Sequence, residues 1–201
     1  MSYEDATTRL ILVRHAESTA NVERRVQGSG DDPLTPRGEE QARRLARRMS
    51  FDHPDADLLF SSPLTRAHQT ASFVSAALGL EIQWRSGLEE IRLGRLEGAD
   101  QATLAAAVHA NRLAEYDAET LHDFAERALG TLYGLVAVNP GRTIIVITHL
   151  GVISTALAHW VDRDLVRAWG YGDSLSNAAM SEFIFADQVR LLRQNDAIHL
   201  E

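Results

Sequence analysis

The chain has 201 residues, 45% of them hydrophobic, which is enough apolar material for one globular domain with a sizeable core. Its 20 Lys and Arg against 28 Asp and Glu give a formal net charge of −8, and such a surface repels nucleic acid and anionic membranes. There is no cysteine, which excludes disulfides, thiolate nucleophiles and Cys-ligated metal sites. Without a signal-like apolar segment or an apolar run of membrane length, we expect a cytoplasmic protein with no nucleic-acid and no membrane partner.

The hydrophobic pattern predicts strands that alternate with helices. Apolar runs predict strands at 9–13, 57–61, 80–84 and 143–148, and a closing hairpin at 179–186 and 189–193. Helices are predicted at 36–49, 64–78, 100–114, 121–138 and 152–161, the first with Thr35 as N-cap and Pro36 at its first position. This alternation indicates a layered α/β fold with a mostly parallel sheet.

Cationic or imidazole side chains come at or just after three of the predicted strands. The first strand runs into Arg14 and His15, the second is followed by Arg66 in the next helix, and His149 directly follows the run TIIVIT. Because ligands of such sheets bind outside the carboxyl ends of the strands, we expect these side chains to converge. Two guanidinium groups match phosphate oxygens bidentately, so the pattern predicts a phosphate site. The alternative, a histidine that merely packs in a loop or core, suits one such residue better than two.

Two histidines exceed what phosphate binding alone requires. One neutral imidazole can attack phosphorus, and the other can stabilise the charge that develops on the phosphoryl oxygens. A general acid for the leaving oxygen is expected in LEEIRLGRLEG, residues 88–98, where Glu89 and Glu90 are adjacent. Neighbouring side chains of an extended segment point in different directions, so only one of them is expected to face the site. A pair of surface acids is the alternative.

Seven sequence blocks together resemble the histidine phosphatase superfamily, the phosphoglycerate mutase-like family. They are RHAES at 14–18, Asn21, QG at 27–28, DDPLTPRGEEQA at 31–42, SSPLTRAHQTA at 61–71, LEEIRLGRLEG at 88–98 and ITHLGVI at 147–153. The resemblance covers nearly the whole chain. It implies a three-layer α/β/α sandwich of the phosphoglycerate mutase type, formed as a single domain over 1–201 with a short cap insert at about 99–118. It also implies that no cofactor and no metal is needed.

The resemblance assigns a role to each matching residue. It makes His15 the phosphorylated nucleophile, Arg14 and Arg66 the phosphate clamp, and His149 the residue that completes the pocket. Counting four residues back from Gly94 selects Glu90 as the proton donor. The remaining matches are expected to contact the phosphate or the substrate: Asn21, Gln27, Gly28, Ser62 and Leu150, the last through its backbone N–H.

The chain departs from the family pattern at three places. Ala16 and Leu150 stand where glycine is usual, and the segment P-x-G-E-S is represented only by Ala118, Glu119 and Thr120. A leucine keeps its backbone N–H for phosphate provided that its φ is negative. The Gly and Ser of that segment, with the substrate contacts they would make, are absent from this chain.

The leading prediction is a cofactor-independent phosphomonoesterase that hydrolyses small phosphorylated metabolites and releases phosphate. The same residues would serve a phosphoglycerate mutase-type transfer, but a mutase must exclude water from the phosphoenzyme, and the short insert argues for an open site. A third hypothesis is a non-catalytic phosphate-binding module. The chain retains both histidines, both arginines and Glu90, which argues against it. A metal hydrolase is disfavoured because no HExxH-like ligand spacing is present. The oligomeric state, monomer or homodimer, stays open.

Overall fold

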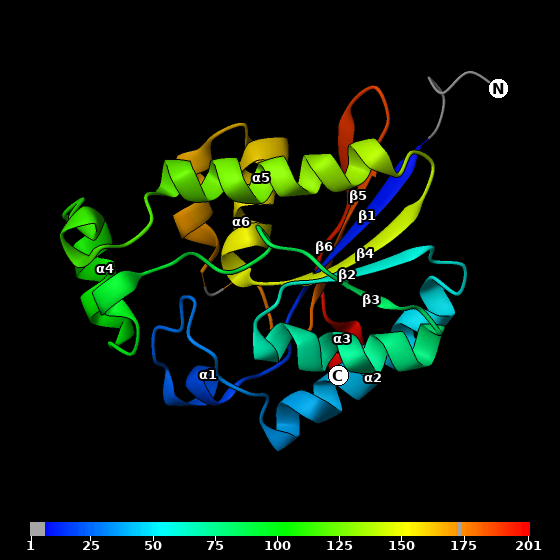
Figure 1. Ribbon diagram of the computed structural model, residues 1–201, viewed down its shortest axis with the longest axis horizontal. Coiled ribbons are helices and arrows are strands. Elements are labelled where there is room, and N and C mark those ends of the chain that lie inside the picture. Colours follow the sequence, from blue (N-terminus) through cyan, green and yellow to red (C-terminus); the bar gives the residue numbers. More distant parts are fainter. Residues whose placement is uncertain (1–6, 173) are drawn as a thin grey trace.

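The chain is built around a mixed β-sheet, seen in a computed structural model that describes residues 7–172 and 174–201 (Figure 1). The strands found in these ranges are β1 (Thr8–Arg14), β2 (Leu58–Ser61), β3 (Ile82–Trp84), β4 (Thr143–Thr148), β5 (Met180–Phe185) and β6 (Val189–Asp196). Their order in the sheet is β3-β2-β4-β1-β5-β6. The pairings among the first four are parallel, and β5 runs antiparallel to both β1 and β6. The predicted mostly parallel sheet and its closing hairpin are therefore confirmed.

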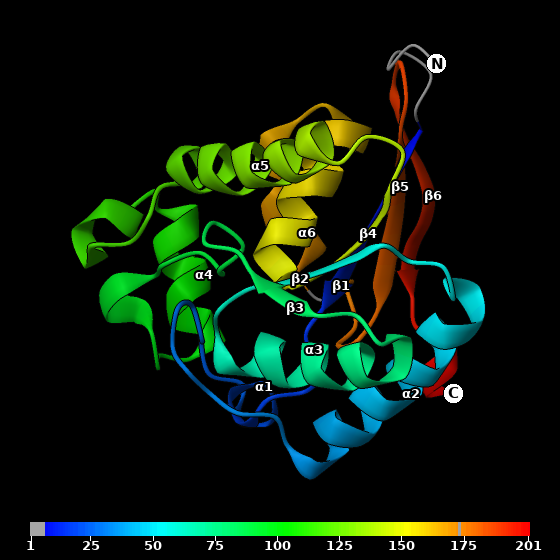
Figure 2. The same cartoon turned by 45° about the vertical axis from the view of Figure 1, so that its right-hand side comes forward.

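Helices cover both faces of the sheet, which confirms the three-layer sandwich (Figure 2). One face carries α5 (Leu121–Val138) and α6 (Leu150–Leu157), and the other carries α2 (Pro36–Asp52) and α3 (Thr65–Leu78). Alternate residues of each central strand serve different faces: Leu10 and Leu12 join the core under α5 and α6, whereas Ile11 and Val13 join the core over α2 and α3. Two buried faces explain why these strands are continuous apolar runs.

The ends of the helices follow from local chemistry. The Thr35 hydroxyl accepts a 2.9 Å hydrogen bond from the Gly38 N–H at the start of α2, and Thr120 caps α5 through the Asp123 N–H at 3.1 Å. Helix α3 ends at Gly79, whose φ of +69° is left-handed. The helices predicted at 64–78 and 121–138 are confirmed, and the one predicted to end at 49 continues for three residues.

Two predicted helices have different boundaries. The segment 100–114 is divided, because Asn111 adopts a left-handed φ of 54° between α4 (Gln101–His109) and a 3₁₀ turn at Leu113–Tyr116. Helix α6 starts at Leu150, two residues before the predicted start, and widens into a π-turn at Ala158–Asp162.

Several short elements have too few residues to show a hydrophobic period and were not predicted: α1 (Thr19–Glu23) and 3₁₀ turns at Gly94–Leu96, Leu165–Tyr171 and Ile198–Leu200. In the described part of the chain, no helix has both the length and the apolar character needed to span a membrane.

Candidate active site

His15 stands directly after β1, at the carboxyl edge of the sheet, and is only 3% exposed. Its Nδ1 lies 2.8 Å from the backbone oxygen of Ala16. A carbonyl oxygen only accepts, so Nδ1 carries the proton, and in the neutral ring the lone pair is on Nε2. Burial, and next the positive charges of Arg66 and Arg14, lowers the pKa of His15 well below its usual range. The resting side chain is therefore a neutral imidazole with an unprotonated Nε2.

His149 and Ser62 form a second buried pair, delivered by β4 and β2. The ring centroids of His149 and His15 are 5.3 Å apart, and Nε2 of His149 lies 2.7 Å from the Ser62 hydroxyl. Burial, and next the charge of Arg66, lowers the pKa of His149 well below its usual range. A hydroxyl can donate or accept, so this contact accommodates either protonation state of His149.

Arg66 is 1% exposed on the first turn of α3. Its two terminal nitrogens donate to the backbone oxygens of Gly30, at 2.5 Å, and Gly28, at 2.8 Å. Gly28 has a left-handed φ of +49°, and a Cβ there would lie 2.5 Å from Oε1 of Glu97, so the loop requires glycine. Arg66 thus supplies a fixed charge and at the same time holds the neighbouring loop in place.

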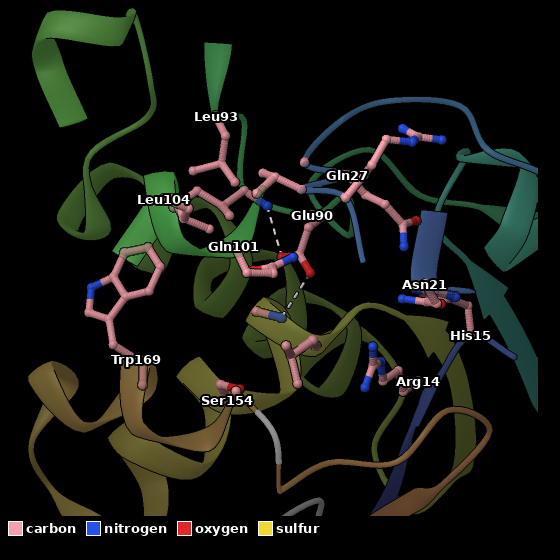
Figure 3. A pocket seen from close by; sticks show the side chains of 18 of the residues that line it. Arg14, His15, Asn21, Gln27, Glu90, Leu93, Gln101, Leu104, Ser154 and Trp169 are labelled. Atoms are coloured by element: carbon pink, nitrogen blue, oxygen red, sulfur yellow. Dashed lines mark hydrogen bonds between the residues drawn. The ribbon is translucent and has the colours of Figure 1, made fainter. Parts of the chain in front are cut away.

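The two adjacent acids, Glu89 and Glu90, take different directions. Glu90 lines the pocket, and its carboxylate accepts hydrogen bonds from the N–H groups of Ile91, at 2.9 Å, and Gly151, at 3.0 Å (Figure 3). Glu89 instead accepts from the Gly87 N–H at 2.6 Å and lies 3.6 Å from Nη1 of Arg127. Only Glu90 is therefore placed in the pocket. Gly151 permits this contact, because a Cβ at that position would lie 2.1 Å from Oε1 of Glu90.

These residues surround a pocket of about 180 Å³ at the carboxyl edge of the sheet. Eight of the predicted site residues line it: Arg14, His15, Asn21, Gln27, Gly28, Arg66, Glu90 and Leu150. The other two, Ser62 and His149, are fully buried: the His149 ring lies beside that of His15, and Ser62 lies against His149. Asn21 Oδ1 accepts hydrogen bonds from Ser18 and from Asn177, so its amide nitrogen is the group left to face the pocket. All the residues that the sequence pattern selected thus meet in one place.

Residues 10–197 match the family model described as the histidine phosphatase superfamily (branch 1). The chain belongs to the histidine phosphatase superfamily. A "Probable phosphoglycerate mutase GpmB" from Salmonella arizonae is 32% identical over 174 residues, which are 77% of this chain and 78% of that protein.

Solved structures of similar proteins include phosphatases. A phosphoserine phosphatase mutant from Entamoeba histolytica, in complex with phosphoserine, is 25% identical and has a TM-score of 0.85, covering 96% of this chain and 100% of the other. A mycobacterial glucosyl-3-phosphoglycerate phosphatase is 25% identical with a TM-score of 0.79, covering 94% and 99% of the two chains.

In this member of the histidine phosphatase superfamily, the loop of Glu90 is held by an ion pair between Arg127 and the buried Glu119, which was not predicted from the sequence. Arg127 of α5 donates to the backbone oxygens of Gly87, Glu89 and Glu90, at 3.1 to 3.3 Å, and to both carboxylate oxygens of Glu119, at 2.8 and 2.9 Å. Burial opposes the charge of Glu119, but hydrogen bonds from Arg127 and from the Arg92 N–H outweigh it and lower its pKa. The residue that remains from the incomplete P-x-G-E-S segment is therefore structural here.

Other residues that line the pocket were not predicted from the sequence. They are apolar side chains from separate elements and two neutral polar ones: Val26, Ile91, Leu93, Leu104, Ala168, Trp169, Gln101 and Ser154. These residues are far apart in the sequence and carry no motif. Only the fold shows that they share a cavity. The described residues contain no group of three or more His, Asp or Glu that could hold a metal ion.

Proposed function

We propose that this chain is a metal-independent phosphomonoesterase that works through a phosphohistidine on His15. The neutral, oriented imidazole of His15 carries this proposal: Nδ1 is engaged by the Ala16 carbonyl, which leaves Nε2 as a nucleophile in a pocket walled by Arg14 and Arg66. A purely phosphate-binding module would have no need for a desolvated, tautomer-fixed histidine beside a carboxyl group.

In the first step, Nε2 of His15 attacks the phosphorus and the bond to the ester oxygen breaks. The carboxyl proton of Glu90 passes to the departing oxygen, which leaves as a neutral alcohol. The guanidinium groups of Arg14 and Arg66 stabilise charge on the phosphoryl oxygens as it develops. The products of this step are the alcohol, a phosphorylated His15 and an ionised Glu90.

In the second step, the carboxylate of Glu90 takes a proton from water, and the water oxygen attacks the phosphorus. The bond between phosphorus and Nε2 breaks, which regenerates the neutral His15 and releases inorganic phosphate. The same carboxyl group thus serves as acid and then as base. Glu90 is suited to both tasks because two backbone N–H groups fix its orientation inside the pocket.

Phosphoryl transfer of the mutase type is the second candidate, because one relative bears the name of a probable phosphoglycerate mutase. A mutase must keep water from the phosphoenzyme. The segment at 99–118 contributes only Gln101 and Leu104 to the pocket lining, which is a small cover for that purpose. This observation favours hydrolysis, as do the structural relatives that are named phosphatases.

A panel of phosphate esters assayed in EDTA tests the proposal. We expect turnover to persist, vanadate to inhibit, and an alkali-stable, acid-labile phosphoryl label to form on the protein. His15→Gln should abolish both the label and turnover, whereas His122→Gln, an exposed histidine of α5, should leave both intact. Loss of activity in EDTA with recovery on adding a divalent ion would overturn the metal-free mechanism.

A further inference from the structure

Resting on the proposed phosphatase function, we infer that the preferred substrates are small phosphate esters whose organic group is uncharged and largely apolar. Esters that carry a second anionic group, such as a carboxylate, are poor substrates. The organic group attached to the phosphate occupies the end of the pocket that lies away from Arg14 and His15 (Figure 3).

The pocket has two chemically different ends (Figure 3). His15, Arg14 and Asn21 lie at one end, and Trp169, Leu104 and Leu93 lie at the other, with Glu90 between them. A phosphate held by the arginines, with its ester oxygen at Glu90, therefore directs its organic group toward Trp169 and the leucines. Binding is favoured when the apolar surface of this organic group is removed from water at that end.

The apolar end continues into a small adjoining cavity of about 30 Å³. Its walls include Leu121 and Phe124 of α5, and it shares Ile91, Ala168 and Trp169 with the main pocket. Apolar side chains therefore surround this end of the pocket on several sides. An aromatic ring or a short alkyl chain would find contacts all around it, including the face or edge of the Trp169 indole.

Three arginines line the pocket, Arg14, Arg25 and Arg66. Arg14 lies at the phosphate end, beside His15 (Figure 3). Arg66 holds the loop carbonyls of Gly28 and Gly30 at the phosphate end. Arg25 is shared between Glu23, at 2.5 Å, and Asp32, at 2.9 Å, so its charge is already compensated. None of the described residues that make up the apolar end is a Lys, Arg or His. A carboxylate placed there would lose its hydration without gaining an opposite charge.

The neutral polar groups of that end do not change this conclusion. The Ser154 hydroxyl is buried and has no hydrogen-bond partner within the described residues, and Gln101 is an uncharged amide. Either group can satisfy a hydroxyl or carbonyl of a substrate, but neither neutralises a charge. The volume of about 180 Å³ lies below the roughly 300–1,000 Å³ of pockets for drug-sized ligands, which points to a compact organic group.

Benzyl phosphate and 4-carboxybenzyl phosphate test the inference, because both release a benzylic alcohol and differ mainly in charge. We expect kcat/KM to be about tenfold or more higher for benzyl phosphate, within the range that pocket contacts produce. 3-Phosphoglycerate and phosphoserine should also be poor relative to benzyl phosphate. Equal or better turnover of the carboxylated esters would overturn the inference and leave the phosphatase function standing.

Substitutions in the pocket test which residues cause the preference for the uncharged ester. Trp169→Ala should lower kcat/KM for benzyl phosphate about tenfold and leave methyl phosphate nearly unchanged, since methyl phosphate does not reach the ring. Trp84→Ala, a half-exposed tryptophan of edge strand β3, is the matched control and should change neither. Leu104→Arg adds a cation on the exposed helix α4 and should raise kcat/KM for the carboxylated ester. A Trp169→Ala variant that lost both substrates equally would contradict the assigned subsite.

Binding of the non-hydrolysable phosphonates separates the two proposals. Calorimetry with benzylphosphonate and 4-carboxybenzylphosphonate should show the same preference for the uncharged ligand even if no ester is turned over. Absence of turnover with an intact preference would refute the phosphatase function alone. Turnover without the preference would refute the substrate inference alone.

Discussion

The two histidines of the pocket have the same type of side chain and the same neutral charge, but different neighbours assign them different chemistry. His15 faces a carbonyl oxygen, which fixes its tautomer and keeps Nε2 unprotonated. His149 faces the hydroxyl of Ser62, which can reverse its role as donor or acceptor. In the proposed mechanism, this contact lets His149 take up a proton when a phosphoryl group brings negative charge into the pocket, whereas His15 attacks the phosphorus.

Arg66→Ala should lower kcat/KM about a hundredfold or more, because the lost charge is fixed and almost fully removed from water. The variant also loses its hydrogen bonds to Gly28 and Gly30, so part of the loss will come from a looser loop. Steady-state kinetics with one ester, together with a thermal melt, separate activity from unfolding. Arg47→Ala, whose side chain is mostly exposed on α2, is the control and should change neither quantity. Equal, small effects of both substitutions would contradict the role given to Arg66.

Glu90→Gln should slow alkyl phosphates by about a hundredfold and slow p-nitrophenyl phosphate much less, since nitrophenolate leaves without a proton. Glu89→Gln should leave both substrates nearly unchanged, because the Glu89 carboxylate is turned toward Gly87 and Arg127. The measurement is kcat for both substrates with both variants. A leaving-group dependence in Glu89→Gln instead would show that the proton comes from the neighbouring position.

At the scale of elements, the strands that set the site could be predicted from the sequence because their two faces are both buried. The run TIIVIT predicts β4 to the residue, and the helix predicted at 121–138 has the bounds of α5. What the pattern does not contain is the short helix α1, where a five-residue segment is stabilised by the reciprocal capping of Ser18 and Asn21.

Part of the candidate site could also be predicted from the sequence. Residues at strand ends, such as His15 and His149, could be predicted because a polar side chain directly after a buried strand is unusual. Arg127 and Trp169 could not be predicted in this way, because each acts through neighbours tens of residues away in the sequence. Gly151 carried a local signal: a glycine within the first turn of a buried helix marks the close approach of another group, which is Glu90.

Arg127→Met should reproduce part of the Glu90 defect from outside the pocket. The substitution removes the donors that hold the backbone oxygens of Gly87, Glu89 and Glu90. It also removes the closer of the two charged partners of the buried Glu119 and leaves only the exposed Arg92, at 3.4 Å. We expect kcat for alkyl phosphates to fall more than kcat for p-nitrophenyl phosphate, which a general loss of folded protein would not produce. Arg127→Lys should restore only part of the difference, because an ammonium cannot reproduce the planar fork. An equal fall for both substrates would mean that Arg127 acts on stability only.

At the scale of the whole molecule, a pocket lined by arginines lies in a protein of negative net charge. The formal charge of the chain is −8, yet Arg14 and Arg66 line the same cavity as His15. A negative surface slows the approach of anions, so in the proposed reaction a phosphate ester is selected by contacts at the pocket and is not attracted by the overall field of the protein. Raising the salt concentration should therefore change kcat/KM little or increase it, the opposite of what a basic protein shows with an anionic substrate.

The burial of neutral histidines also sets how the whole molecule responds to acid. Burial is the largest cause that lowers the pKa of His15, His149, His53 and His199 in the folded state. In the unfolded chain these groups take up protons below about pH 6.5, whereas in the folded protein they resist protonation. The unfolded state then binds more protons, so the free energy of unfolding falls as the pH falls through this range. Carboxylates with lowered pKa, such as Asp57 and Glu119, add a separate loss only near pH 4 and below.

We therefore expect the loss of stability to begin near pH 6.5 rather than near pH 4. Urea unfolding in phosphate-free buffers between pH 7.5 and 5 measures it, and His15 and His149 should each contribute up to about 1.4 kcal/mol per pH unit below about pH 6.5. The double variant His15→Gln, His149→Gln should show a shallower slope, because neither glutamine titrates. A free energy of unfolding that stays constant from pH 7.5 to 5 would show that the folded and unfolded states take up the same number of protons over this range. It would contradict the lowered pKa values of His15 and His149, and with them the neutral His15 ring in the folded protein below pH 6.5.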